Sequence, residues 1–280
     1  MGAATVRKLR ALGNSVVGVD LTDADIVADL STETGRRVAA AGVLAACGER
    51  AEDLQGAVLA AGVGPTSGAE RLITEVNYRG VVELLEAWRP ALAATGNAKV
   101  VVFSSNSTTT VPAVPRRAVR ALLAGEIDRA LRSYRVFGRK APAMAYAASK
   151  IAVSRWVRRH AVMPQWAGRG IRLNALAPGP IRTPMLDRQL STAADARLVE
   201  SFPVPIGGFG DADQLADWVL FMLSDAAEFL CGSVIFVDGG SDAYFRADDW
   251  PAAFPASRLL SYFRRTREFG VQGTHGRSRR

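Results

Sequence analysis

The chain of 280 residues is 49% hydrophobic and 22% charged, a composition typical of a globular protein with a sizeable core. Two cysteines and two histidines exclude a disulfide framework and argue against a histidine-based zinc site, so no bound metal is expected. No apolar run approaches the roughly 20 residues that a membrane span needs, and the first residues lack the apolar core of a signal peptide. We therefore expect a cytoplasmic protein with reduced thiols and no membrane partner.

The formal net charge of +8 is concentrated in two segments. Residues 106–145 carry a net charge of +6 and residues 246–280 carry +5, so the rest of the chain is slightly acidic. A basic balance can indicate nucleic-acid binding, but these arginines are not interleaved with stacking aromatic residues in a recognisable module. We expect no nucleic-acid partner.

Short apolar runs alternate along the chain with longer segments of helical periodicity. The expected strands cover residues 15–20, 26–29, 56–61, 99–104, 171–177 and 233–237, and the expected helices cover 32–50, 69–94, 143–163 and 211–224. Continuous apolar strands separated by helices are typical of βαβ units with a parallel sheet covered on both faces. The sequence therefore predicts an α/β fold.

The two basic segments do not belong to that alternation. Within residues 106–145, the spacing of apolar side chains predicts a helix over Ala118–Tyr134, with arginines on its other side. Residues 246–280 begin with aromatic residues, pass through a possible short helix and end in a polar run, 273–280, that is typical of disorder. We expect one domain over residues 1–245 with a basic helical insertion, followed by a C-terminal extension.

Tyr146 and Lys150 stand four residues apart in a helical context, which places both side chains on one face. A tyrosine is a poor base at neutral pH because its ordinary pKa is about 10, and a neighbouring ammonium lowers that value. The pair is therefore a candidate for proton transfer. The alternative is a solvated lysine beside a tyrosine that packs between helices.

The surrounding residues make the chain resemble the short-chain dehydrogenase/reductase family. Its Tyr-x-x-x-Lys motif matches Tyr146 and Lys150, its strand-end serine matches Ser105, and its helix asparagine matches Asn77. Further matches are Ala60, Ala61 and Gly62 after the third strand, Pro178 and Gly179 in a turn, and the run 237–240, all in the family's order over about residues 2–245. The run 61–65 and the long gap before Tyr146 resemble the 3α-hydroxysteroid dehydrogenase/carbonyl reductase subgroup.

The resemblance implies a Rossmann-like, doubly wound parallel sheet and a role for each catalytic residue. Tyr146 would be the general acid or base, and Lys150 would lower its pKa and bind the nicotinamide ribose. Ser105 would donate to the substrate oxygen, and Asn77 would hold a water that relays protons. The alternatives are that Ser105 binds only local backbone and that Asn77 caps a neighbouring backbone group.

The resemblance also implies a dinucleotide cofactor. Asp20 ends the strand whose carboxylate binds the ribose hydroxyls and repels a 2′-phosphate, which favours NAD over NADP, although Asp20 could instead cap a loop or helix. Asp29 and Leu30 match adenine-contacting residues, with a helix cap as the alternative for Asp29, and Thr183 is placed to bind the carboxamide. The remaining cofactor-binding candidates are Gly2, Ala60, Ala61, Gly62, Tyr146, Lys150, Pro178, Gly179 and Ile181.

These roles imply an oxidoreductase that transfers a hydride between NAD and a hydrophobic secondary alcohol or ketone, of the steroid or aromatic carbonyl class. We expect a homodimer or homotetramer. The candidate substrate wall combines the insertion with residues 184–206, in particular Met185, Leu186, Leu190, Leu198 and Phe202.

The N-terminus departs from the family pattern, and Ala60 replaces the family's asparagine. Only Gly2 matches the glycine-rich phosphate loop, so the first strand and most of that loop are missing from the sequence, and two strand edges would be left unpaired. One explanation is a start assigned to an internal methionine. The alternative is a truncated, catalytically impaired binding protein with this fold.

Overall fold

A computed structural model of the protein describes residues 1–48, 54–183, 186, 197 and 199–273, with side chains described as far as residue 269. The chain divides into two compact units, residues 1–245 and residues 246–280. Each unit is described separately below.

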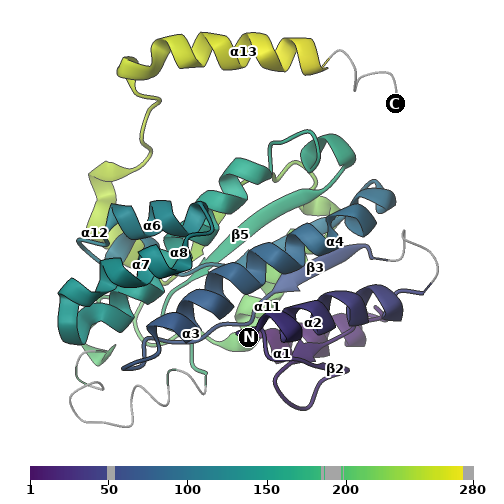
Figure 1. Ribbon diagram of the computed structural model, residues 1–280, viewed down its shortest axis with the longest axis horizontal. Coiled ribbons are helices and arrows are strands. Elements are labelled where there is room, and N and C mark those ends of the chain that lie inside the picture. The colour runs from purple at the N-terminus through teal and green to yellow at the C-terminus, as the bar shows by residue number, and fades with distance from the viewer. Residues whose placement is uncertain (49–53, 184–185, 187–196, 198, 274–280) are drawn as a thin grey trace. The chain divides into compact units, whose positions relative to one another are not determined.

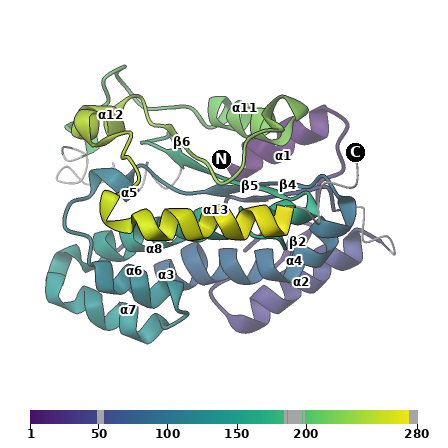
Figure 2. The same ribbon diagram turned by 90° about the horizontal axis from the view of Figure 1, so that it is seen from above.

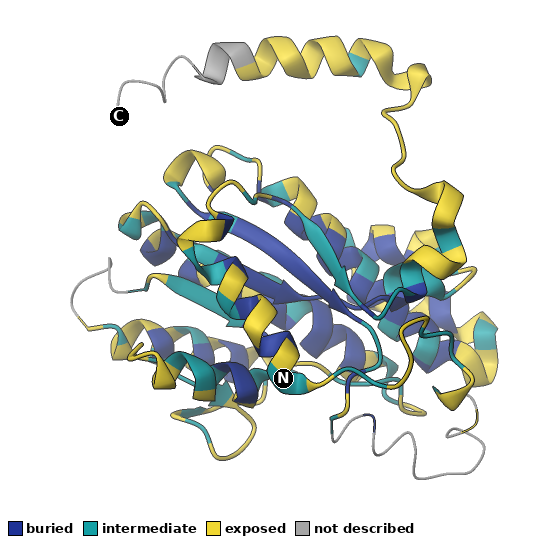
Figure 3. Ribbon diagram, turned by 180° about the vertical axis from the view of Figure 1, so that it is seen from behind, coloured by how far each residue is buried: buried dark blue, intermediate teal, exposed yellow. Residues whose placement is uncertain are grey.

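The centre of the first unit is a parallel sheet of four strands. In order across the sheet these are β3 (Gly56–Leu59), β4 (Lys99–Phe103), β5 (Arg172–Pro178) and β6 (Val234–Val237) (Figure 1). Because β4 and β5 lie in the middle and are covered on both faces, nearly all of their residues are buried (Figure 3). Their uninterrupted apolar sequences are those of strands with no solvent-facing side.

Two further strands form a separate small sheet. β1 (Val19–Asp20) and β2 (Ile26–Val27) pair in parallel, and each is shorter than the apolar run that predicted it. In the described part of the chain, β1 does not pair with β3. The pairing of β1 with β2 extends over two residues. The prediction that neighbouring strand edges are left unpaired is therefore confirmed.

Helices cover both faces of the four-stranded sheet (Figure 2). One face carries α2 (Glu33–Ala46), the continuous run of α3 (Glu70–Thr74), a π-helical turn η2 (Glu75–Gly80) and α4 (Val81–Thr95), and α8 (Ala141–His160). The other face carries α1 (Gly2–Ala11) and α11 (Ala212–Leu223), which pack together. The larger hydrophobic core lies on the α2, α4 and α8 side, and the smaller one lies under α11.

Residues 116–134 of the insertion form two helices, although the sequence predicts one. After the short α5 (Ser107–Thr110), α6 (Arg116–Leu123) and α7 (Ile127–Tyr134) are separated at Gly125, whose φ of 77° is left-handed. The two helices pack on each other and on α8, and a 3₁₀ segment η3 (Arg135–Lys140) leads into α8. The prediction of a single helix over Ala118–Tyr134 is therefore wrong, because a glycine in this conformation ends a helix. The predicted apolar face is nevertheless buried at Leu122 and Ile127.

Short segments complete the molecule. The first unit includes η4 (Ala167–Arg169), η5 (Asp225–Ala227) and α12 (Ser241–Arg246), whose last residue opens the second unit. The second unit continues with η6 (Ala247–Asp249), η7 (Ala256–Arg258) and α13 (Leu259–Gly273), a longer helix than the sequence predicted. The rest of the run predicted to be disordered, 274–280, lies outside the described residues. Among the helices of the described chain, none is both long and apolar enough to cross a membrane.

Candidate active site

The carboxyl ends of the parallel strands bring the sequence-predicted catalytic residues together. Ala60–Gly62 follow β3, Ser105 follows β4, and Gly179 follows β5. In an open parallel sheet this edge is where ligands bind, because the strand ends and the following loops converge there. Tyr146 and Lys150 approach the same edge from α8.

Lys150 is held in the interior of the protein. Its side chain is 4% exposed, and its Nζ donates a hydrogen bond to the carbonyl oxygen of Phe103 at the end of β4, at 2.8 Å. The Nζ also lies 5.9 Å from the centroid of the Tyr146 ring. Burial disfavours the charged ammonium and lowers the pKa of Lys150 to about 8, so both protonation states are accessible near neutral pH.

Tyr146 is one helical turn from Lys150, and its phenol interacts with the side chain of Ser105. Burial raises the pKa of the Tyr146 phenol, and the interaction with Ser105 opposes that rise. Burial is the largest effect on both groups and disfavours the charged form of each, and a lowering of the Tyr146 pKa by Lys150 stays a prediction. The phenol retains its proton more strongly than an exposed tyrosine does.

Ser105 has a second partner, because its Oγ accepts a hydrogen bond from the backbone N–H of Ser107 at 3.1 Å. The local-backbone alternative for Ser105 is thus observed alongside its contact with Tyr146. This backbone bond fixes the Oγ at the start of α5.

Asn77 lies in the π-helical turn η2 and is fully buried. Its Oδ1 accepts from the N–H of Val63 at 2.7 Å, and its Nδ2 donates to the carbonyl of Val63 at 3.0 Å. The backbone-capping alternative for Asn77 is therefore observed. A Cβ added at Gly62 would lie 3.4 Å from the Asn77 Oδ1 and 3.8 Å from the Lys150 Nζ, so the segment after β3 lies directly beside these two side chains.

Two serines that sequence reasoning missed support this arrangement. Ser104 and Ser154 share a hydrogen bond of 2.6 Å between their hydroxyls, and Ser154 also donates to the carbonyl of Lys150 at 2.9 Å. They join the end of β4 to α8 beneath the catalytic pair. The only sequence signal was the spacing of four residues between Lys150 and Ser154, which places both on one helix face.

The glycines at the sheet edge mark places where chain segments approach closely. A Cβ at Gly2 would lie 3.4 Å from the Cβ of Ala60, so the beginning of α1 lies against the end of β3. A Cβ at Gly179 would lie 2.7 Å from the Cα of Asp238, which excludes any larger residue. Gly179 also donates to the carbonyl of Val237 at 3.1 Å.

The residues after Pro178 form a short connected turn. Ile181 is buried and pairs with Gly210 in an isolated bridge. The Thr183 Oγ1 donates to the carbonyl of Ile181 at 3.2 Å and accepts from the N–H of Leu186 at 3.4 Å. Its predicted contact with a carboxamide stays a prediction.

Asp20 and Asp29 are exposed and make only local contacts. The Asp20 carboxylate accepts from the N–H of Leu21 at 2.7 Å, a loop contact, and the Asp29 carboxylate accepts from the N–H of Ser31 at 2.9 Å. Hydrogen bonds from Ser31 hold the pKa of Asp29 below its usual value.

The cap of α2 is the side chain of Thr32, which accepts from the N–H of Gly35 at 3.0 Å. The alternative that Asp29 caps this helix is therefore wrong. Leu30, next to Asp29, is tied to the core of the molecule, because its carbonyl accepts from the Arg36 Nη1 at 3.0 Å.

The candidate substrate wall is only partly described. Leu186 is buried, and Phe202 contacts Phe245 with ring centroids 5.9 Å apart. Met185, Leu190 and Leu198 lie outside the described residues.

Several buried donors near Ser105 have capacity for a ligand. Across the described residues, Phe103 provides the one hydrogen-bond acceptor for the Lys150 Nζ, which has three donor hydrogens. The buried Asn106 Nδ2 and Ser107 Oγ have no hydrogen-bond partner among those residues either. Because buried polar groups are normally satisfied, this donor set fits the hydroxyls of a nicotinamide ribose and a substrate oxygen.

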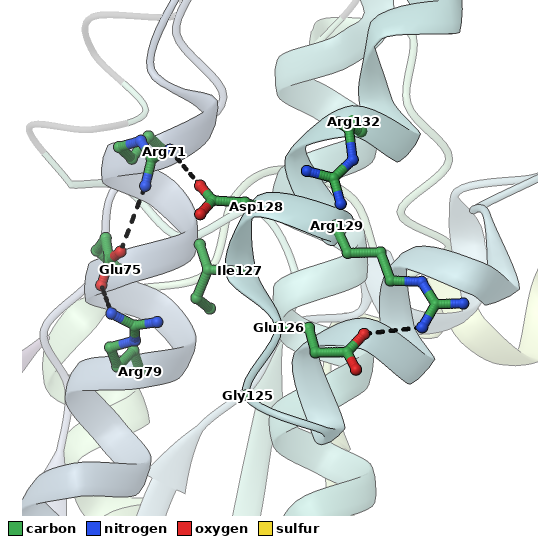
Figure 4. A pocket seen from close by; sticks show the side chains of 9 residues that line it. All are labelled: Arg71, Glu75, Arg79, Gly125, Glu126, Ile127, Asp128, Arg129 and Arg132. Carbon is green, nitrogen blue, oxygen red and sulfur yellow. Dashed lines mark hydrogen bonds and ion pairs between the residues drawn. The ribbon is translucent and has the colours of Figure 1, made fainter.

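A cluster of ion pairs joins the insertion to the helix that carries Asn77 (Figure 4). Arg71 of α3 pairs with Asp128 of α7 at 2.5 Å and with Glu75 of η2 at 3.9 Å, and Arg79 pairs with Glu75 at 3.4 Å. These residues line a hollow between α3, η2 and α7. Its charged side chains largely neutralise one another, so its clearest role is to hold the insertion against η2.

Comparison with known proteins agrees with this geometry. The family model described as enoyl-(acyl carrier protein) reductase matches residues 130–242. The chain is 37% identical over 246 residues to 3-alpha-hydroxysteroid dehydrogenase/carbonyl reductase of Comamonas testosteroni, covering 88% of this chain and 94% of that protein.

Solved structures are also similar. The crystal structure of 3-alpha-hydroxysteroid dehydrogenase from Pseudomonas sp. B-0831 complexed with NADH aligns with a TM-score of 0.81 and 40% identity, over 88% of this chain and 94% of that one. Levodione reductase aligns with a TM-score of 0.66 and 25% identity, over 86% and 93%. With the sheet edge, the Tyr146–Lys150 pair and these relatives in agreement, the chain belongs to the short-chain dehydrogenase/reductase family.

Proposed function

We propose that this chain is an NAD-dependent oxidoreductase that transfers a hydride between nicotinamide and a hydrophobic secondary alcohol or ketone, of the hydroxysteroid or aromatic carbonyl class. The observation that carries the proposal is the interaction of the Tyr146 phenol with Ser105, with the Nζ of the buried Lys150 5.9 Å from the centroid of the Tyr146 ring. The relatives named for hydroxysteroid dehydrogenase and carbonyl reductase activity support the substrate class.

The chemistry follows from two hydroxyls at one point. A substrate carbonyl oxygen placed between Tyr146 and Ser105 accepts a hydrogen bond from each, and these bonds strengthen as negative charge develops on that oxygen. Tyr146, whose phenol is protonated at neutral pH, then transfers its proton to the oxygen. The nicotinamide, when bound, supplies or accepts the hydride. In the oxidation direction Tyr146 takes the alcohol proton.

Lys150 and Asn77 contribute to the proposed cofactor-binding site. The Lys150 Nζ retains donor hydrogens beyond its bond to Phe103 and can give them to the ribose hydroxyls. Asn77 holds Val63 by both of its backbone groups, which keeps the segment after β3 beside Lys150. The grouping of all four catalytic candidates favours an enzyme over the alternative of an impaired binding protein.

The choice of NAD, the assembly and the location are part of the proposal. Asp20 presents an exposed carboxylate at the end of β1, and such a group favours ribose hydroxyls over a 2′-phosphate. A homodimer or homotetramer in the cytoplasm is proposed. The insertion packs on α8 and α3, so subunit contacts on that side of the molecule would involve α6 and α7.

The test compares wild type with Tyr146→Phe, using NADH formation from a panel of hydroxysteroids and aryl alcohols. Removing the group that accepts the alcohol proton is expected to lower kcat about a thousandfold while thermal stability stays close to wild type. Tyr78→Phe is the matched control, because Tyr78 is also buried, and burial raises its pKa to about 12. Equal rates for wild type and Tyr146→Phe would overturn the proposed mechanism.

A further inference from the structure

The helix α13 has one side of exposed aromatic and aliphatic residues. At 100° per residue, Leu259, Tyr262, Phe263 and Phe269 fall within one arc of the helix, and they are between 50% and 71% exposed. Tyr262 contacts both Phe254 and Phe263, with ring centroids 5.7 Å apart in each pair. A set of large apolar side chains this exposed indicates a surface that binds something.

The other side of α13 is basic. Arg264 lies opposite the apolar arc, Arg265 and Arg267 lie at its two edges, and the helix's single acidic residue, Glu268, pairs with Arg264 at 3.8 Å. The whole segment 246–280 has eight basic and three acidic residues, a net charge of +5. A partner for this segment must therefore tolerate a concentrated positive charge while covering aromatic rings.

Charge decides between the occupants of this surface. Two copies of α13 packed face to face would bring two net positive segments together, which is unfavourable at physiological ionic strength. A membrane with anionic headgroups offers both an acyl boundary for the apolar side and negative charge for the arginines. We propose that α13 binds the surface of an anionic membrane, lying in the plane of the interface with its apolar side inward.

This inference goes beyond the proposed enzymatic function and concerns a different part of the chain. The sequence-based expectation of no membrane partner rested on the absence of a spanning run of apolar residues. That criterion does not test surface binding, because a helix in the interface needs amphipathicity rather than overall hydrophobicity. A charged helix of this kind is also expected to release from the membrane as salt screens its arginines.

The experiment measures co-sedimentation of the full chain with vesicles of phosphatidylcholine alone or of equal parts phosphatidylcholine and phosphatidylglycerol. Binding to the anionic vesicles is expected, with weaker binding to the neutral ones and loss at high salt. Phe263→Ser is expected to lower the partition about tenfold. In the double variant Arg264→Gln with Arg265→Gln, each arginine removed is expected to lower it about fivefold.

Matched controls come from the first unit. Phe229→Ser removes a fully exposed phenylalanine outside α13, and Arg116→Gln with Arg117→Gln removes two exposed arginines from the other basic segment. Both controls are expected to bind anionic vesicles as wild type does. Dehydrogenase activity on a water-soluble substrate is expected to be unchanged in the α13 variants and in Phe229→Ser.

Three outcomes would overturn the proposal. One is wild-type chain that does not sediment with anionic vesicles. Another is a Phe263→Ser variant that binds vesicles normally but changes from an oligomer to a monomer, which would assign the apolar side to a second copy. The third is short duplex DNA that binds wild type more tightly than the vesicles do and loses binding in the arginine variant.

Discussion

The two parts of the first unit that would hold the two ends of a dinucleotide are built differently. The candidate catalytic residues lie at one edge of a four-stranded sheet with helices on both faces, and Asn77, Ser105 and Lys150 are each less than 10% exposed. Asp20 ends a strand of a separate two-stranded sheet and Asp29 follows that sheet; both are exposed and form hydrogen bonds with neighbouring residues of the chain. Packing therefore fixes the reacting groups, whereas local turns fix the groups that select the cofactor.

This difference has an energetic consequence. A buried polar residue is coupled to the stability of the fold, because moving it disturbs both its hydrogen bonds and its desolvated environment. An exposed carboxylate can change with little effect on folding. Substitutions at Asn77, Ser105 and Lys150 should thus change activity and stability together, while substitutions at Asp20 should change selectivity alone.

The largest effect is expected for Lys150→Met. Activity should fall about a thousandfold, because the ammonium proposed to bind the ribose hydroxyls beside Tyr146 is gone. The free energy of unfolding should rise by up to about 3 kcal/mol at neutral pH, since the variant no longer buries a lysine whose pKa is lowered to about 8. Urea unfolding and steady-state kinetics on the same preparations measure both changes.

The pH dependence checks the cause of that stabilisation. The folded-state pKa of Lys150 lies below the unfolded value of about 10.4, so between these values the unfolded chain binds more protons. The free energy of unfolding of the wild type should therefore rise with pH through this window, because the cost of burying a charged lysine disappears. That cost is fully restored as pH falls through about 8. The advantage of Lys150→Met should shrink between about pH 7 and about pH 9.5. An advantage that is constant with pH would show that burial of charge is not its source.

The second-largest effect is expected for Arg36, which connects the catalytic part to the part with Asp20 and Asp29. The side chain of Arg36, on α2, is 4% exposed; it donates to the carbonyl of Leu30 at 3.0 Å and pairs with Glu75 of η2 at 3.5 Å. Glu75 stands two residues before Asn77. Arg36 thus joins the segment expected to contact adenine to the turn that holds a catalytic residue.

Arg36→Met should lower the free energy of unfolding by about 3 kcal/mol, because it leaves the buried Glu75 with one fewer positive partner. Arg37→Met is the matched control: the Arg37 side chain is 72% exposed and its pair with Glu33 spans 3.9 Å, so a loss below about 0.5 kcal/mol is expected. Urea unfolding compares the two. A similar small loss for both variants would mean that the two parts are not held together by this arginine.

Much of the catalytic part could be predicted from the sequence, because local patterns mark it. Apolar runs gave β4 and β5 to within one or two residues, and Tyr146, Lys150, Ser105 and Asn77 all surround one point as the family motif implies. The direction of the Tyr146 pKa shift could not be predicted. It depends on how deeply the packing around α8 buries the phenol, and residue spacing carries no information on that depth.

The remaining errors in the predicted helices and strands arise where tertiary contacts or a single residue determine the backbone more strongly than the spacing of apolar residues does. The apolar spacing in the insertion continues across Gly125, yet the left-handed backbone there divides one expected helix into two. The runs that predicted β1 and β2 are longer than the ladder between them, because strand length depends on a partner that the run itself does not specify. Arg36 was not identified at all, since a single arginine among many in a helix gives no sequence signal that it will be buried.

The smallest expected effect is at Asp20, and it tests the exposed side of the comparison. Asp20→Asn removes the negative charge that repels a 2′-phosphate, so the ratio of kcat/KM for NAD to that for NADP should fall about tenfold. Asp23→Asn is the matched control, because Asp23 is exposed and has a φ of 50°, which asparagine also adopts readily. Neither variant should change the midpoint of urea unfolding. If Asp20→Asn lowers stability by more than about 1 kcal/mol, the cofactor-selecting carboxylate is coupled to the fold after all, and the two parts are not energetically distinct.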